Sequence, residues 1–257
     1  MMSSKRKIPC IPLFMWLFSA SCLVGAAEAQ QKRPMLEQEI MTSEAFLSSH
    51  PDLMNRLRGF HELENRKEPV RAANYFRRAA RYADKTSQAI YAEMLWTGNG
   101  VKQDKPAAYA WMDLAAERGY KDFLPVRERY WAGLDEAQRK AALDIGRKIY
   151  AEYGDEVAKP RMNLIMRRTL RKMTGSRTGS KALAGTLEVR IPGPVGGFAS
   201  FIKLPGEMFY RDEYWDPKEY WIWKGQNIEG ARRGRVTASD IYEANNKPPA
   251  TGKDDNQ

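Results

Sequence analysis

The feature that most constrains this chain is an internal repeat with a fixed period of 36 residues. The segment from Glu68 to Ala83 matches the segment from Asp104 to Gly119 without a gap. Periods between about 20 and 50 residues are typical of supersecondary units that stack side by side. The pattern therefore predicts stacked helix pairs rather than a helical bundle with coincidental spacing. The aligned positions are Glu68, Arg71, Ala72, Tyr75, Ala79, Ala80 and Ala83, and Asp104, Ala107, Ala108, Trp111, Ala115, Ala116 and Gly119.

Each matched segment is expected to form a helix with a face of small residues around one aromatic. Ala72, Tyr75 and Ala79 recur at spacings of three and four, so they share one helix face. The matching residues of the second segment do the same. Small residues let a neighbouring helix approach closely, and the aromatic is expected to fill the gap between units.

Residues at both ends of these helices suggest where they begin and end. Glu68 and Asp104 lie at the expected first turns, where a carboxylate can accept hydrogen bonds from free amides. Pro69 and Pro106 suit the same opening turns, because the amide hydrogen that proline lacks has no partner there. Gly119 is a candidate C-cap.

A further helix is expected between the two segments, from Ser87 to Trp96. It ends at the sequence Thr97-Gly98-Asn99-Gly100-Val101. Two glycines on either side of an asparagine favour a tight left-handed turn. The sequence therefore predicts a helix-turn-helix pair.

The stretch from Tyr91 to Gly119 resembles a Sel-one-like repeat, a relative of the tetratricopeptide repeat. The chain departs from that family at Tyr91-Ala92, where Leu-Gly is usual, at Leu95, where Tyr is usual, and at Ala107, where Lys is usual. Residues 68–83 match the second half of a preceding repeat, and residues 120–133 match the opening of a following one. The resemblance implies an all-α solenoid of helix-turn-helix repeats, a short right-handed superhelix that acts as an adaptor or scaffold and is often exported in bacteria. It implies no chemistry. The matching motif positions are Gly98, Gly100, Val101, Asp104, Trp111, Ala115, Ala116 and Gly119.

The N-terminus has the pattern of a secretory signal peptide over residues 1–29. A basic stretch, Lys5-Arg6-Lys7, precedes an apolar run that ends in small residues at Ala27 and Ala29. A leader retained as an inner-membrane anchor is the alternative, and Cys22 raises the weaker prospect of a lipoprotein. Both cysteines lie in this leader, so the mature chain would contain no disulfide and no cysteine-ligated metal. We expect export, to a bacterial periplasm.

The charge of the chain favours anionic partners. The formal net charge is +10, and removal of the leader leaves 39 basic and 31 acidic side chains. Such a balance suits phospholipid head groups, acidic polymers or an acidic protein surface. Because export separates the chain from nucleic acid, we expect no nucleic-acid partner.

Residues 30–67 are expected to form an N-terminal helical cap, since a terminal repeat would otherwise expose its inner face. Ser43 and Asp52 are candidate N-caps of short helices in this region. His50 and His61 are the only histidines, and they have no metal-ligand spacing. We interpret both as hydrogen-bonded or solvated side chains.

Residues 68–158 are expected to hold the repeats and a closing helix that opens near Leu134 and is punctuated by Gly154 and Pro160. Residues 159–181 contain no acidic side chain and are predicted to form a basic amphipathic helix. That helix either lies on an anionic surface or partner, or caps the repeats with its charged side in solvent. Its candidate binding residues are Arg167, Arg168, Arg171 and Lys172.

Residues 182–244 are expected to form a small aromatic-rich β or irregular extension, followed by a disordered tail over residues 245–257. Residues 186–191 alternate like a strand, residues 198–204 are the expected return, and residues 235–237 could add a third strand. The aromatic cluster either fastens the extension to the repeats or stacks on a glycan. Its candidate binding residues are Trp215, Tyr220, Trp221 and Trp223.

The sequence carries no Gly-x-Ser-x-Gly elbow, phosphate-binding loop or metal triad. Some relatives with such repeats are linked to hydrolysis of cell-wall-type compounds, but those sequences are rich in cysteine. We therefore predict no catalysis, no cofactor and no metal site. The predicted function is an exported scaffold or adaptor that binds an unidentified protein in the cell envelope. The alternative is a module that contacts anionic lipid or cell-wall glycan.

Overall fold

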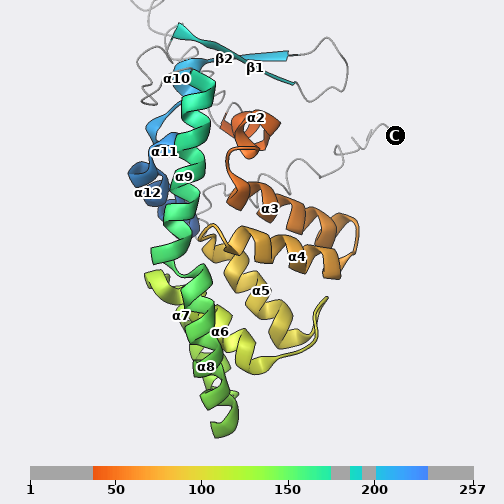
Figure 1. Ribbon diagram of the computed structural model, residues 1–257. Helices are drawn as coiled ribbons and strands as arrows, with labels where there is room; N and C mark the ends of the chain where they lie inside the picture. The colour runs from red at the N-terminus through yellow and green to blue at the C-terminus, as the bar shows by residue number, and fades with distance from the viewer. Residues whose placement is uncertain (1–36, 175–185, 193–200, 231–257) are drawn as a thin grey trace, which may run out of the picture. The chain divides into compact units, whose positions relative to one another are not determined.

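The computed structural model describes residues 37–174, 186–192 and 201–230. The chain divides into two compact units, Met1–Glu39 and Ile40–Gln257. In the first unit only residues 37–39 are described, and they are helical. The second unit is mostly helical with one small two-stranded sheet (Figure 1). Within the described ranges, no helix is both long enough and apolar enough to cross a membrane.

Successive helices of the second unit pack on one another in chain order. Contacts join α3 to α4, α4 to α5, α5 to α6, and α6 to both α7 and α8. The helices are α2 (Glu44–Leu47), α3 (Pro51–Phe60), the π-helix η1 (His61–Asn65), α4 (Pro69–Ala80), α5 (Lys85–Thr97), α6 (Lys105–Ala115), the 3-10 helix η2 (Ala116–Arg118), α7 (Leu124–Ala132), α8 (Glu136–Tyr153), α9 (Asp155–Thr174), α10 (Gly206–Phe209), α11 (Asp212–Trp215) and α12 (Pro217–Gly230). The strands are β1 (Glu188–Pro192) and β2 (Phe201–Pro205).

The matched segments of the sequence form matched helices. α4 begins at Pro69 and α6 begins at Lys105, which preserves the offset of 36 residues. Ala83 and Gly119, which also match, both adopt left-handed backbone, with φ of 58° and 72°. The expected cap at Asp104 is confirmed, because its carboxylate accepts a hydrogen bond from the Ala107 amide at 2.9 Å. Glu68 makes no such bond.

The small residues of the two faces are fully buried, as predicted, and Trp111 is 5% exposed. The expectation for Tyr75 was wrong, because its ring is only half-buried and Arg78 lies over it. Its neighbour Phe76 fills the gap instead. The Phe76 ring packs edge-on against Phe60 at 5.4 Å, and it is 0% exposed.

The turn between α5 and α6 has the predicted left-handed glycines, with φ of 77° at Gly98 and 73° at Gly100. Gly100 also lies directly against the first residue of α4. A β-carbon at this position would overlap the backbone carbonyl of Pro69. The glycine is therefore required both by its backbone angle and by close packing.

α8 and α9 are two long helices in succession, separated by Gly154 (Figure 1). α8 begins with a capping box in which Asp135 and Gln138 bond each other's backbone amides. The expected break at Pro160 was wrong, since α9 already begins at Asp155 and includes that proline. Pro160 has no amide hydrogen, so α9 lacks the one helical hydrogen bond that would reach the carbonyl of Glu156.

The N-terminal caps were partly predicted. Ser43 caps α2, and its hydroxyl accepts a hydrogen bond from the Phe46 amide. Asp52 was wrongly expected to be a cap, because α3 begins one residue earlier, at Pro51. The Asp52 side chain is instead buried under the C-terminal helices.

The C-terminal region contains the predicted hairpin, in which β1 and β2 pair antiparallel with Ile191 opposite Ile202. Residues 206–230, expected to be irregular, form α10, α11 and α12. Aromatic residues favour strands as readily as helices, so their density hid the helical pattern. The leader, residues 175–181, the third strand at 235–237 and the tail at 245–257 lie outside the described residues.

Candidate binding groove

An open groove lies between α4, α5, α6 and α8. It consists of two hollows of about 690 Å³ and about 280 Å³ that share the side chain of Tyr91. The first is lined mainly by the turn between α5 and α6, and the second by α6 and α8. The groove thus brings together residues from helices that are far apart in the sequence.

The floor of the groove is aromatic. The Tyr91 ring meets the Trp111 ring edge-on at 5.0 Å, and Trp111 meets Tyr153 at 4.6 Å. Arg77 Nε donates a hydrogen bond to the Tyr153 hydroxyl at 3.3 Å. Burial raises the pKa of Tyr91, so its hydroxyl is neutral at neutral pH. Because Trp111 and Tyr153 are only 5% and 4% exposed, the aromatic surface that the floor offers to a ligand is mainly the half-buried ring of Tyr91.

The rim of the groove is basic. Its cations are Arg77, Lys102, Lys105 and Lys148. Within the described ranges none of them is held in an ion pair. The two acidic side chains of the lining are engaged elsewhere, since Asp104 caps α6 and Glu152 pairs with Arg81. The groove consequently presents a positive potential to solvent.

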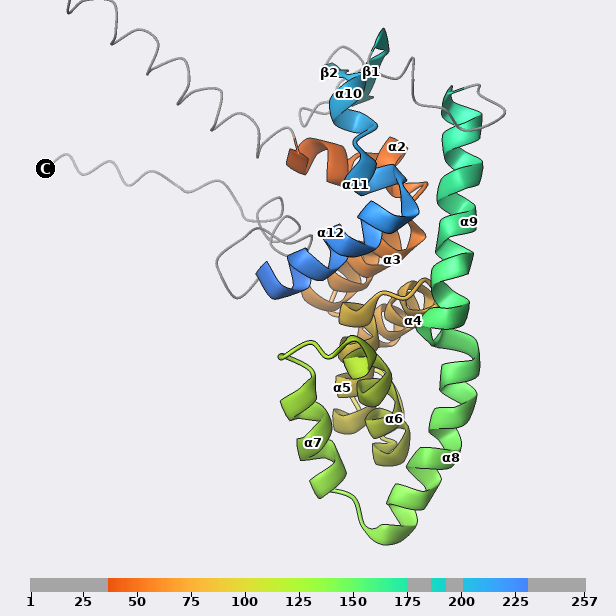
Figure 2. The same cartoon turned by 90° about the vertical axis from the view of Figure 1, so that its left-hand side faces the viewer.

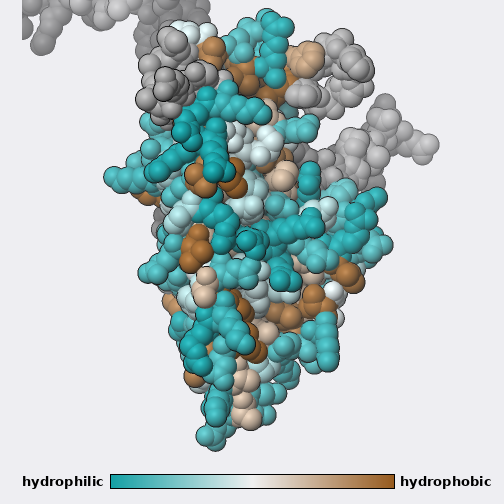
Figure 3. Space-filling view, viewed as in Figure 1, coloured by the Kyte–Doolittle hydropathy of each residue, from teal (hydrophilic) through white to brown (hydrophobic). Residues whose placement is uncertain are grey.

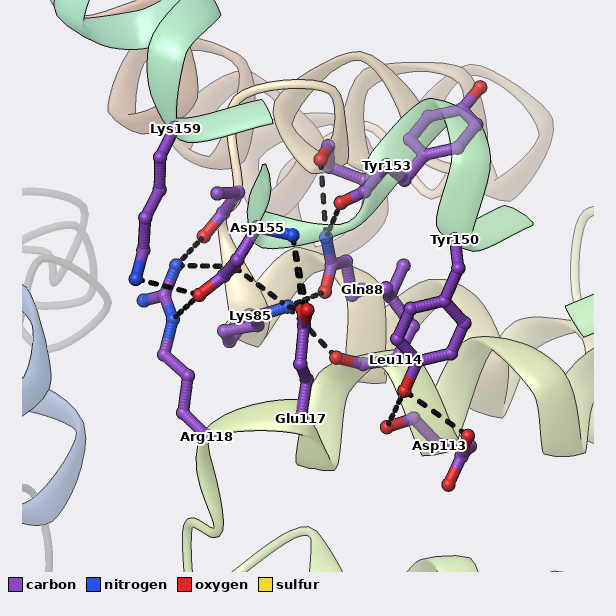
Figure 4. Close-up of polar contacts among 12 residues, drawn as sticks. Lys85, Gln88, Asp113, Leu114, Glu117, Arg118, Tyr150, Tyr153, Asp155 and Lys159 are labelled. Atoms are coloured by element: carbon purple, nitrogen blue, oxygen red, sulfur yellow. Dashed lines mark hydrogen bonds and ion pairs between the residues drawn. The ribbon is translucent and has the colours of Figure 1, made fainter. Parts of the chain in front are cut away.

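A buried polar network holds the groove together from below (Figure 4). At its centre Lys85 is 0% exposed, and its Nζ donates to Glu117 Oε2 at 2.6 Å and to the Leu114 carbonyl at 2.9 Å. Nζ also lies 3.2 Å from Asp155 Oδ1. Burial lowers the pKa of Lys85, and the charge of Asp155 opposes that effect. These contacts fasten the start of α5 to the end of α6, to η2 and to the start of α9.

Gln88 links this network to the floor. Its side-chain nitrogen donates to the carbonyls of Ala80 and Tyr153, at 3.2 and 3.3 Å, while its oxygen accepts from Lys85 Nζ. The backbone of Tyr153 is thus held by Gln88, while its hydroxyl accepts the hydrogen bond from Arg77. The network is expected to preorganise the groove.

Arg118 and Lys159 complete the network by converging on Asp155 (Figure 4). Burial by itself would raise the pKa of Asp155. The hydrogen bond from Arg118 and the charge of Lys85 outweigh burial, and they hold that pKa well below its usual range. Asp155 is therefore a carboxylate at neutral pH, and α9 begins at this cluster of three cations and two carboxylates.

A second buried ion cluster fastens the C-terminal helices. Lys224 Nζ of α12 lies 2.9 Å from Asp52 Oδ2 and 2.6 Å from Asp84 Oδ1, and Arg56 also pairs with Asp84. The Tyr220 hydroxyl donates to Asp52 Oδ2 at 2.6 Å. Burial alone would raise the pKa of Asp84, but the charges of Arg56 and Lys224 hold it well below its usual range. This cluster explains why α12 is part of the fold.

The aromatic residues proposed from the sequence belong to this junction. Trp215 and Tyr220 are 1% and 0% exposed, so their assignment as ligand-binding residues is corrected to packing residues. Trp221 donates to Asn163 of α9, and Arg118 and Lys159 lie over its ring. Trp223 is half-buried and packs against Tyr214 and Tyr220.

The basic residues proposed from the sequence do not join the groove. Arg167, Arg168, Arg171 and Lys172 are all exposed on α9. The apolar side of the same helix, Met162 and Met166, is buried against Tyr220. α11 packs beside α9 in the same region (Figure 2). Burial of this apolar face favours the second expectation, a helix that packs on the fold with its charged side in solvent, and it leaves the four cations accessible.

The sequence-based search missed the residues of the groove, above all Tyr91. One signal was present, since Tyr91-Ala92 departs from the Leu-Gly of the repeat family. Among the described residues, no group of His, Cys, Asp and Glu could hold a metal ion. Comparison with known proteins finds no matching family model, no matching curated protein and no matching solved structure.

Proposed function

We propose that this chain is a non-catalytic binding scaffold that holds a partner protein in the groove around Tyr91. The observation that carries the proposal is the groove itself, with its aromatic floor and accessible rim. Interfaces concentrate binding energy in aromatic residues that are surrounded by polar rims. The buried networks beneath it keep the floor rigid, which reduces the entropy lost on binding.

We further propose that α5 and α6 form one Sel-one-like unit of a short right-handed solenoid, and that α4 is the second half of a preceding unit. Support comes from the offset of 36 residues between the starts of α4 and α6, and from the left-handed Ala83 and Gly119 after them. Scaffolding is the role that such repeats imply. The proposed compartment is the bacterial periplasm, with an inner-membrane anchor as the alternative, and it rests on the leader sequence alone.

Partner capture tests the scaffold. Envelope extract is passed over the immobilised wild-type chain, the Tyr91→Ala variant and the Tyr75→Ala variant. Tyr75 is a matched control, because it is also a half-buried tyrosine of the repeated region but does not line the groove. We expect Tyr91→Ala to lose proteins that wild type and Tyr75→Ala retain, with thermal unfolding confirming that both variants are folded. Identical captured sets for all three would refute the scaffold.

A second candidate function is peripheral binding to anionic lipid through α9. The four exposed cations Arg167, Arg168, Arg171 and Lys172 favour it, and the surface over α9 is mostly hydrophilic with isolated apolar spots (Figure 3). Because the buried methionines cannot insert, such binding would be electrostatic and would fall steeply with salt. Flotation with vesicles containing phosphatidylglycerol, compared with pure phosphatidylcholine vesicles, tests it. Equal flotation with both vesicles would eliminate this candidate.

A further inference from the structure

The charges of the groove are distributed on both sides of its aromatic centre. Lys102 and Lys105 line the larger hollow, and Arg77 and Lys148 line the smaller one. Tyr91 belongs to both hollows, so it is the residue that links the two pairs of cations. A ligand that uses every feature must be elongated, with negative charge at both ends and apolar surface in the middle.

The hydrogen-bond donors of these cations favour carboxylate ligands. Arg77 uses Nε for the Tyr153 hydroxyl, which leaves its terminal nitrogens for a ligand. Lys102 and Lys148 are exposed and have no ion pair within the described part of the chain. The lining also holds the carboxylates of Asp104, which caps α6, and Glu152, which pairs with Arg81. The four cations outnumber these two carboxylates, so the lining keeps a net positive charge. Carboxylates that pair with such rim cations add specificity and speed association.

The middle of the groove favours a peptide over a polyanion. Tyr91 and Ile145 are half-buried there, and Leu95, Trp111 and Ile149 add only edges, since they are 8%, 5% and 8% exposed. None of these residues offers a cation to a phosphate or sulfate. A nucleic acid or anionic polysaccharide would place charge over this apolar surface and lose hydration without compensation. An apolar side chain of a peptide would instead gain from burial there.

We propose that the groove binds an extended acidic segment of its partner, with carboxylates on both sides of an apolar residue that packs against Tyr91. This inference rests on the proposed scaffold function and specifies the chemistry of its partner. The carboxylates pair with Arg77 and Lys148 at one end and with Lys102 and Lys105 at the other.

Fluorescence anisotropy with synthetic peptides tests the inference on the full chain. The probe is a short labelled peptide with a central Leu-Phe pair flanked on both sides by glutamates. One comparison peptide replaces the glutamates with lysines, and another replaces the Leu-Phe pair with serines. We expect the first peptide to bind, the lysine peptide not to bind, and the serine peptide to bind about tenfold more weakly. Equal binding of the serine peptide would mean that the groove takes any polyanion, and would overturn the proposal.

Two double variants that each remove two positive charges distinguish pairing in the groove from attraction to the overall positive charge of the protein. The variant Arg77→Gln/Lys148→Gln should lose about tenfold in affinity, while Arg167→Gln/Arg168→Gln should lose less than about twofold. Thermal unfolding of both variants checks that loss of the Arg77 bond to Tyr153 leaves the fold intact. Equal losses of affinity in the two variants would mean that the net charge of the protein attracts the peptide, and would overturn the proposal.

The capture experiment distinguishes failure of this inference from failure of the scaffold. If Tyr91→Ala loses a partner that the groove double variant keeps at full strength, the scaffold stands and the acidic segment is refuted. If neither variant changes the captured proteins, both are refuted.

Discussion

At the scale of single residues, the buried side chain of His50 bridges two parts of the fold through its two ring nitrogens. Its two ring nitrogens lie 2.9 Å from the Phe46 carbonyl oxygen and 2.8 Å from the Tyr214 carbonyl oxygen. The ring is 0% exposed and stacks on Phe46 at 3.9 Å. The interpretation of this histidine as a hydrogen-bonded side chain is thus confirmed, and the bond to Tyr214 ties α2 and α3 to the C-terminal helices.

The titration of His50 should make stability depend on pH. Burial lowers its pKa, although Asp52 opposes burial and Lys224 adds to it. As pH falls below about 6.5, the unfolded chain therefore takes up a proton before the folded chain does, and folding stability declines. We expect the free energy of unfolding, measured with urea between about pH 7 and about pH 5, to fall less steeply in His50→Gln than in wild type. An unchanged slope in His50→Gln would contradict this assignment.

At the scale of elements, the sequence predicted those turns, caps and strand pairs that depend on residues close together in the chain. The α5–α6 turn, the Asp104 cap and the β1–β2 hairpin depend on residues a few positions apart, and all were predicted correctly. The partnership of Asp52 with Lys224 joins residues that are 172 positions apart, and no local pattern encodes it. The groove was missed for the same physical reason, because four separate helices must pack before Arg77 and Lys148 share a lining with Tyr91.

Two glycines with nearly the same backbone angle allow packing to be separated from strain. Gly119 has φ of 72° and no neighbouring atom near the position of an added β-carbon, so Gly119→Ala should cost only the left-handed strain, about 1 kcal/mol. Gly100 has φ of 73°, but its added methyl group would overlap Pro69 at the start of α4. Gly100→Ala should therefore cost about 1–3 kcal/mol more than Gly119→Ala. Urea denaturation of both variants checks the difference, and equal costs would mean that α4 does not press on this turn.

At the scale of the whole molecule, the C-terminal helices complete the fold that begins with α3. α12 supplies Lys224 to two buried carboxylates, and Tyr220 covers Met162 and Met166 of α9. A buried carboxylate that loses its cation typically costs about 3–5 kcal/mol. A chain that ends at Pro205 should therefore unfold at a clearly lower urea concentration than the full chain.

A peptide of residues 206–230, added in excess to that shortened chain, should restore part of the lost stability, because binding to the folded state alone raises stability. The same peptide with Lys224→Ala should restore little, since Asp52 and Asp84 would stay buried with one cation missing. A Lys218→Ala peptide is the matched control, because Lys218 is an exposed lysine of the same helix. If the Lys224→Ala peptide stabilised the shortened chain as well as the control peptide, aromatic packing alone would hold α12. The buried ion cluster would then serve only to fix its register.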